Sequence, residues 1–250
     1  MSAVRRGKPF LLLATREHDG VADAEHAAVL RHGGLRPGEL VRVRLERGPM
    51  PEVDLDDFSG VVVGGSPFCT SDPEGSKSDV QRRVERELAT LLDRVVAADA
   101  PFLGACYGIG TLGVHRGGVV DRTYGEPIGT APVTLTAAGR ADPVLGALPD
   151  TFEAFVGHKE ALRVPPPHAV VLATSPACPV QAFRVGENLY ATQFHPELDV
   201  DGIVQRVGAY RDSGYFPPHE HDEVVARLRR SRVQVASRVL RRFVERYRRS

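Results

Sequence analysis

One cysteine and one distant histidine stand in surroundings that fit nucleophilic catalysis. Cys106 follows the apolar run 100–105 and precedes the glycine-rich run 107–113, which predicts a strand, a tight turn and a helix. Amides at a helix N-terminus would favour the thiolate form of such a cysteine. His195 and Glu197 are two positions apart, so in an extended segment their side chains face the same side. Together these residues predict a nucleophile, a general base and the group that orients the base.

A second glycine-rich turn could complete such a site. Gly64 and Gly65 follow the β-branched run 61–63, which predicts a short central strand. Acyl transfer needs backbone N–H groups aimed at the developing oxyanion. The pair could also form only a turn after the strand. The interpretation as an oxyanion loop therefore depends on the cysteine and histidine motifs found with it.

These three pieces, at 60–67, 100–110 and 193–197, resemble the class I glutamine amidotransferase family in type and chain order. The similarity is greatest to the amidotransferase part of GMP synthase and its stand-alone relatives, and it covers roughly Phe10 to Glu197. The resemblance implies a single flavodoxin-like α/β domain. Its parallel central sheet would carry helices on both faces and a small antiparallel layer.

The resemblance also implies an activity. Cys106 would attack the side-chain amide of glutamine or of a γ-glutamyl compound, giving a thioester that water then cleaves. The N–H groups of Gly65 and Tyr107 would hold the oxyanion, beside Gly64, and His158 would lie near the substrate. A separate synthetase could consume the ammonia, or the chain could act alone as a γ-glutamyl hydrolase.

One position departs from the family pattern. The family usually carries glutamine two residues after the glycine that follows the cysteine, and here that position is Gly110. That glutamine commonly helps to hold the substrate. We therefore expect vacated space at Gly110, weaker use of glutamine, and a preference for a γ-glutamyl compound with a larger leaving group.

Two other functions remain open from the residues alone. Gly108, Gly110 and Gly113 match the spacing of a dinucleotide fingerprint, but no strand ending in an acid follows at the usual distance. The chain could also be a binding or regulatory protein that kept the fold and lost turnover. His219 and His221 lack further metal ligands nearby, and we predict neither a cofactor nor a metal.

Composition bounds the class of protein. The 250 residues fit one domain, and 32 basic residues balance 32 acidic ones, so no net field would attract nucleic acid. Three cysteines without CxxC spacing argue against a disulfide framework. No apolar run approaches a membrane span. We predict a cytoplasmic protein that acts on a small molecule.

The remaining elements follow from apolar periodicity. The predicted strands cover 10–14, 40–45, 61–63, 131–136, 169–174, 180–185 and 189–194, and the predicted helices cover 22–32, 79–98, 111–115, 200–212 and 220–247. Residues 199–250 would form a C-terminal helical extension of the single domain 1–250. Its last helix, rich in arginine, could mediate a homo-oligomer.

Overall fold

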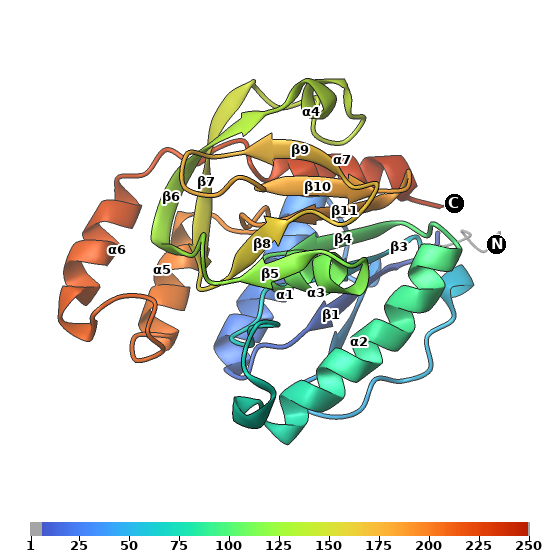
Figure 1. The fold of residues 1–250 in the computed structure, drawn as a ribbon, viewed down its shortest axis with the longest axis horizontal. Helices are drawn as coiled ribbons and strands as arrows, with labels where there is room; N and C mark the ends of the chain where they lie inside the picture. The colour runs from blue at the N-terminus through green and yellow to red at the C-terminus, as the bar shows by residue number, and fades with distance from the viewer. Residues whose placement is uncertain (1–6, 250) are drawn as a thin grey trace, which may run out of the picture.

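The computed structural model describes residues 7–249 and contains a nine-stranded mixed sheet with helices on both faces (Figure 1). The strand order is β2-β1-β3-β4-β11-β10-β9-β6-β7. The strands are β1 (Phe10–Ala14), β2 (Leu40–Arg44), β3 (Gly60–Val63), β4 (Phe102–Ala105), β6 (Glu126–Leu135), β7 (Thr151–His158), β9 (Val170–Thr174), β10 (Ala182–Val185) and β11 (Leu189–Thr192). The α/β prediction with a largely parallel central sheet is confirmed.

Five neighbouring strands, from β2 to β11, run parallel. Strands β1, β3, β4 and β11 are buried along their whole length. A parallel strand covered on both faces loses water on both sides, which explains their continuous apolar runs. Because the four strands are parallel, the segments that follow them emerge at one edge of the sheet, where open α/β sheets bind ligands.

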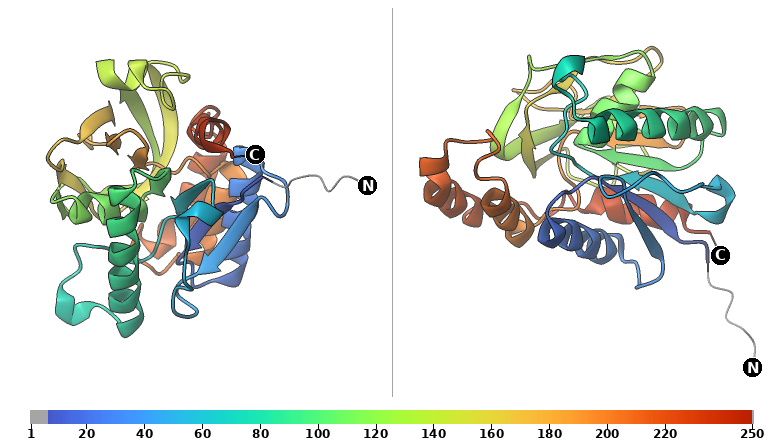
Figure 2. Two further views of the ribbon diagram at one scale, coloured as in Figure 1. Left: turned by 90° about the vertical axis from the view of Figure 1, so that its right-hand side faces the viewer. Right: turned by 90° about the horizontal axis from the view of Figure 1, so that it is seen from below.

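Helices cover the two faces in pairs. Helices α1 (Asp19–Gly33) and α7 (Arg238–Tyr247) pack on one face, and α2 (Asp79–Ala97) and α3 (Tyr107–His115) on the other (Figure 2). Successive β1 residues alternate between these cores, since Leu12 contacts the first cluster and Leu13 the second. Helix α2 begins where the Ser78 side chain accepts from the Gln81 N–H, a cap that satisfies one orphan donor.

The predicted small antiparallel layer is confirmed, since β5 (Val119–Asp121) and β8 (Ala161–Val164) form an antiparallel sheet of their own. The antiparallel strands β10, β9, β6 and β7 extend the large sheet beyond β11. The short helix α4 (Ala137–Ala141) lies beyond the end of β6.

The predicted long C-terminal helix is wrong. Helix α6 (His221–Arg229) ends at Arg230, and α7 begins only at Arg238, because the intervening residues leave the helical path. Helix α5 (Val200–Ala209) precedes them and packs against α6. The apolar side of α7 is buried in the domain core through Leu240 and Phe243. Between residues 7 and 249, no helix has both the length and the apolar character that crossing a membrane requires.

Candidate active site

Cys106 lies at a strained turn between β4 and α3. Its φ is 53° and its ψ is −92°, a conformation that L-residues rarely adopt and that active sites often contain. The backbones of β4 and α3 approach closely here because Gly104 has no Cβ. A Cβ at that position would lie 2.7 Å from the Gly108 backbone. The Cys106 N–H donates to Thr192 O at 2.8 Å, which joins this turn to the end of β11. The predicted strand–turn–helix elbow is therefore present.

His195 and Glu197 follow β11 and lie beside each other as predicted, although a turn and not an extended segment joins them. His195 Nδ1 donates to Glu197 Oε1 at 2.8 Å, and both side chains are buried. The His195 N–H donates to Phe155 O of β7 at 3.0 Å, so a neighbouring strand fixes the backbone of the histidine. This bond leaves Nε2 as the ring nitrogen that could exchange a proton with a group in the pocket. Cys106 and His195 both line that pocket.

Two arginines and a glutamate extend this pair into a buried ionic chain. Arg206 of α5 donates from Nη2 to Glu197 Oε1 at 2.9 Å and to Glu25 Oε1 at 3.1 Å. Arg16, in the loop after β1, donates from Nε to the same Glu25 oxygen at 3.0 Å. Arg206 Nη1 also lies 3.0 Å from His195 Nδ1. Sequence reasoning missed Arg16, Glu25 and Arg206, since no local spacing joins positions so far apart.

The electrostatics make the resting Cys106–His195 pair neutral. Burial raises the pKa of the Cys106 thiol to about 12, although Arg16 and Arg206 act against this shift. Burial also lowers the pKa of His195, while Glu197 acts to raise it. The pKa of Glu197 is held below its usual range because His195 and Arg206 outweigh burial. For Cys106, desolvation thus outweighs the stabilisation of the thiolate by nearby positive charge, contrary to the expectation from its place at a helix N-terminus.

The predicted oxyanion donors lie in two segments, the Gly64–Gly65 turn and the start of α3 at Tyr107, and their N–H groups differ in whether they are already hydrogen-bonded. The Gly64 N–H already donates to Leu13 O at 3.1 Å, so it is engaged within the sheet. A Cβ on Gly65 would lie 2.8 Å from His195 Cε1 and 2.5 Å from Arg16 Nη2, which requires glycine there. Tyr107 is the first residue of α3, and N–H groups at that position lack intrahelical partners.

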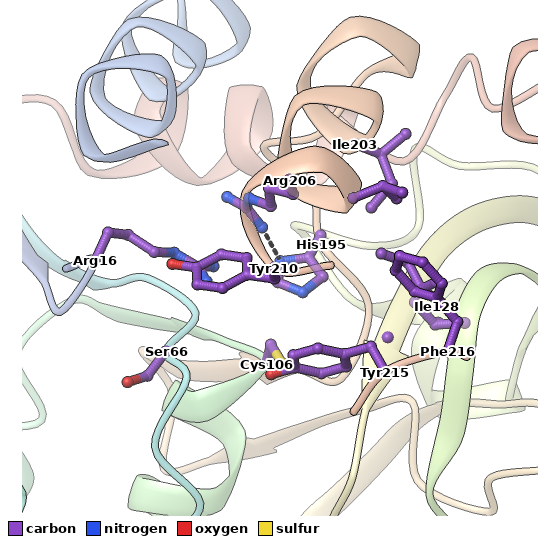
Figure 3. Close-up of a pocket in the computed structure, with 13 residues that line it drawn as sticks. Arg16, Ser66, Cys106, Ile128, His195, Ile203, Arg206, Tyr210, Tyr215 and Phe216 are labelled. Atoms are coloured by element: carbon purple, nitrogen blue, oxygen red, sulfur yellow. Dashed lines mark hydrogen bonds between the residues drawn. The ribbon is translucent and has the colours of Figure 1, made fainter. Parts of the chain in front are cut away.

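A pocket opens beside Cys106 and His195 (Figure 3). Its enclosed volume is only about 30 Å³. Figure 3 shows Arg16 on one side of the pocket and Phe216 on the other, with Tyr210 and Tyr215 between them. The aromatic residues come from the segment after α5, so the C-terminal extension supplies part of the wall.

His158 is not among the residues that line this pocket. Its Nδ1 donates to Glu160 O at 2.9 Å, and its Nε2 lies 2.9 Å from Glu126 Oε2. Glu126, His158 and Cys178 are all buried, and the atoms through which they could bind a metal ion lie within 4.8 Å of one another. Gln181 Nε2 also donates to that Glu126 oxygen at 2.7 Å. The hydrogen bonds already made by His158 and Glu126 account for this cluster as a structural network.

The space expected at Gly110 is occupied. A Cβ there would lie 3.0 Å from Thr70 Oγ1 and 3.1 Å from Glu160 Oε1. Glu160 in turn accepts from Thr70 N and Oγ1 and from Ser71 N, at 2.7 to 3.0 Å. The expectation of vacated space is wrong, because a capped loop fills the position that a side chain at 110 would take. Gly110 does not line the pocket.

The other glycines of the apparent dinucleotide fingerprint also serve packing. Gly108 and Gly113 lie within α3, where added Cβ atoms would meet Val63 O at 3.1 Å and Leu162 Cδ1 at 2.8 Å. Close approach of the helix to its neighbours explains these glycines. The dinucleotide alternative therefore has no support from the fold.

Fold and site define an α/β protein with a pocket at the carboxyl edge of a parallel sheet, lined by a cysteine and by a histidine that is paired with a glutamate. The family model described as glutamine amidotransferase class-I matches residues 29–201. The chain belongs to that family.

Curated relatives and solved structures agree with this assignment. GMP synthase [glutamine-hydrolyzing] from Thermus thermophilus is 26% identical over 190 residues, which are 72% of this chain and 34% of the relative. GMP synthase from Aeropyrum pernix is 32% identical over 144 residues, 58% of this chain and 25% of the relative. The chain thus spans about a third or less of these enzymes. The structure of a glutamine amidotransferase from Thermotoga maritima superposes with a TM-score of 0.72 at 22% identity, covering 97% of this chain and 99% of that one.

Proposed function

We propose that the chain is a cysteine amidase that hydrolyses the side-chain amide of glutamine or of a γ-glutamyl compound. The observation that carries this proposal is the pocket lined by both Cys106 and His195, with His195 Nδ1 held 2.8 Å from Glu197. A nucleophile, a base and an orienting carboxylate are the parts that covalent acyl transfer requires.

The neutral resting pair indicates how the reaction would begin. His195 takes the proton from the Cys106 thiol as sulfur attacks the amide carbonyl carbon, so charge separates only during the attack. The N–H groups of Gly65 and Tyr107 donate hydrogen bonds to the developing oxyanion. Glu197 stabilises the imidazolium that forms.

The second half of the cycle returns the proton. The imidazolium protonates the departing nitrogen, the C–N bond breaks, and a thioester on Cys106 remains. His195 then removes a proton from water, whose oxygen attacks the thioester and releases a carboxylate and the thiol. Glutamine is the leading substrate, because the filled space at Gly110 removes the reason to prefer a larger leaving group. Similarity to GMP synthases supports a separate synthetase as the consumer of ammonia.

Incubation of the purified chain with glutamine and a panel of γ-glutamyl amides and peptides tests the proposal. We expect ammonia or amine to be released from at least one member, and Cys106→Ala to abolish that release. A Cys178→Ala variant serves as the matched thiol control and should keep the activity. Turnover that persists in purified Cys106→Ala would dispose of the mechanism. A folded wild-type chain inert toward the whole panel would favour the non-catalytic binding protein.

A further inference from the structure

The two arginines of the pocket differ in how far their guanidinium groups are satisfied. Arg206 donates two hydrogen bonds from Nη2, to Glu197 and Glu25, and its Nη1 lies 3.0 Å from His195 Nδ1. Arg16 is 4% exposed and pairs with Glu25 through Nε alone. Its Nη2 is buried without a hydrogen-bond partner among residues 7–249. An unsatisfied buried guanidinium nitrogen is costly and needs an explanation.

The position of Arg16 supplies one. Its Nη2 would lie 2.5 Å from a Cβ built on Gly65, and His195 Cε1 would lie 2.8 Å from the same point. The free nitrogen therefore stands over the Gly65 turn, beside the ring of the proposed base. The Tyr210 ring lies 5.8 Å from Arg16 Cζ and holds the guanidinium from its face.

The order of the strands explains why Arg16 can reach this point. Strands β1, β3, β4 and β11 are consecutive neighbours in the sheet. Arg16, Gly65, Cys106 and His195 each follow the carboxyl end of one of them. The four residues thus form a row along one edge, and Arg16 occupies its outer end.

We propose that Arg16 binds a carboxylate of the substrate and is the main specificity determinant of this pocket. The inference rests on the proposed hydrolysis of glutamine or a γ-glutamyl compound and adds which residue binds the α-carboxylate that these substrates carry. An arginine fork is suited to carboxylate recognition, and the ion pair with Glu25 keeps the guanidinium charged and oriented. The recognition subsite accordingly lies on the Arg16 side of Cys106, since Thr70 and Glu160 fill the Gly110 side.

A pair of small electrophiles tests the subsite without any turnover. Iodoacetate and iodoacetamide alkylate a thiol by the same displacement of iodide, and they differ in carrying a carboxylate or an amide. The rates at Cys106, followed by peptide mass mapping, give a ratio in which general thiol reactivity cancels. We expect Arg16→Gln to lower the iodoacetate-to-iodoacetamide ratio about tenfold, which corresponds to about 1.4 kcal/mol.

Two further variants complete the design. Arg16→Lys keeps a charge beside Glu25 and loses the fork, so its ratio should fall between those of the wild type and Arg16→Gln. Arg211→Gln is the matched control, because Arg211 is exposed just beyond α5 and does not line the pocket. Its ratio should equal that of the wild type. An unchanged ratio in folded Arg16→Gln would overturn the subsite and leave Arg16 with a structural or oxyanion role.

Ligand protection of the unmodified chain decides the question if Arg16→Gln fails to fold. We expect glutarate to slow the labelling of Cys106 by iodoacetamide, and the uncharged glutaramide not to. Equal protection by both compounds would overturn the proposal. Both experiments are independent of amide hydrolysis: a chain that hydrolyses no amide yet shows the carboxylate preference would refute the proposed function and retain the subsite.

Discussion

Replacing Gly110 with glutamine restores the residue that the family usually carries, and the structure predicts that the change is harmful. Glutamine in place of a helical glycine should gain about 0.5–1 kcal/mol from helix propensity. Its side chain must enter space where Thr70 Oγ1 and Glu160 Oε1 lie 3.0 and 3.1 Å from the added Cβ. Displacing Glu160 would break hydrogen bonds to Thr70 and Ser71.

The magnitude follows from those bonds. A hydrogen bond to a charged group contributes about 1.5–3 kcal/mol, so losing two of the three costs roughly 3–6 kcal/mol. Partial hydration of the released carboxylate and the propensity gain offset part of this loss. We expect a net destabilisation of about 3 kcal/mol, which for a domain of this size lowers the melting temperature by roughly 6–12 °C.

Thermal unfolding and glutamine hydrolysis, measured on the same preparations, check this prediction. Gly110→Ala is the control, because a single methyl needs only a small adjustment of Thr70 and also gains helix propensity; its melting temperature should stay near that of the wild type. Gly110→Gln should not hydrolyse glutamine faster. A Gly110→Gln protein that melts no lower than the wild type and hydrolyses glutamine faster would refute the reasoning.

Three further predictions concern the catalytic groups. His195→Ala should abolish turnover as Cys106→Ala does, while Glu197→Gln should leave a measurable remnant, because the orienting group tunes a nucleophile and base that act as a unit; kcat/KM of the three variants checks this. Arg206→Gln should move the acid limb of kcat/KM to higher pH, because Arg206 lowers the pKa of His195 and the base must be neutral to accept a proton; Arg206→Lys, which keeps the charge, should move it less. Limited iodoacetamide treatment with peptide mapping should label Cys106 first. Burial raises the pKa of Cys69, Cys106 and Cys178 alike to about 12, so accessibility decides, and of these three cysteines only Cys106 is partly exposed. First labelling of Cys69 or Cys178 would contradict this prediction.

The parts of the fold that sequence alone predicted are those encoded by local pattern. The run Phe10–Ala14 is a strand with the predicted bounds, and α2 covers all but the last residue of its predicted range. His195 and Glu197 are adjacent as predicted, but the chain between them forms a turn and not the predicted extended segment. The turn at Cys106 was predictable because a strand, a tight turn and a helix start follow one another within a few residues.

Features that depend on distant pairing escaped prediction. Arg16, Glu25 and Arg206 each resemble ordinary surface residues in sequence. The packing of α1 against α5, next to the loop after β1, brings them together. The absence of a side chain at Gly110 could be interpreted as empty space. Nothing in the sequence indicates that Glu160, fifty residues downstream, lies beside this position. The break between α6 and α7 allows the two helices to bury their apolar sides in different places. Helix α6 packs with α5, whereas α7 packs in the core beside α1.

The unusual backbone at Cys106 has a consequence for how stability and activity trade against each other. A non-glycine residue held at φ 53° and ψ −92° carries conformational strain of about 1–3 kcal/mol. Cys106→Ala retains a Cβ and therefore the strain, whereas Cys106→Gly relieves it. The glycine variant should thus unfold at a higher temperature than the alanine variant, despite its greater entropy when unfolded. In this protein the residue at position 106 opposes folding, so a search for thermostable variants that does not also select for turnover would tend to remove the proposed nucleophile.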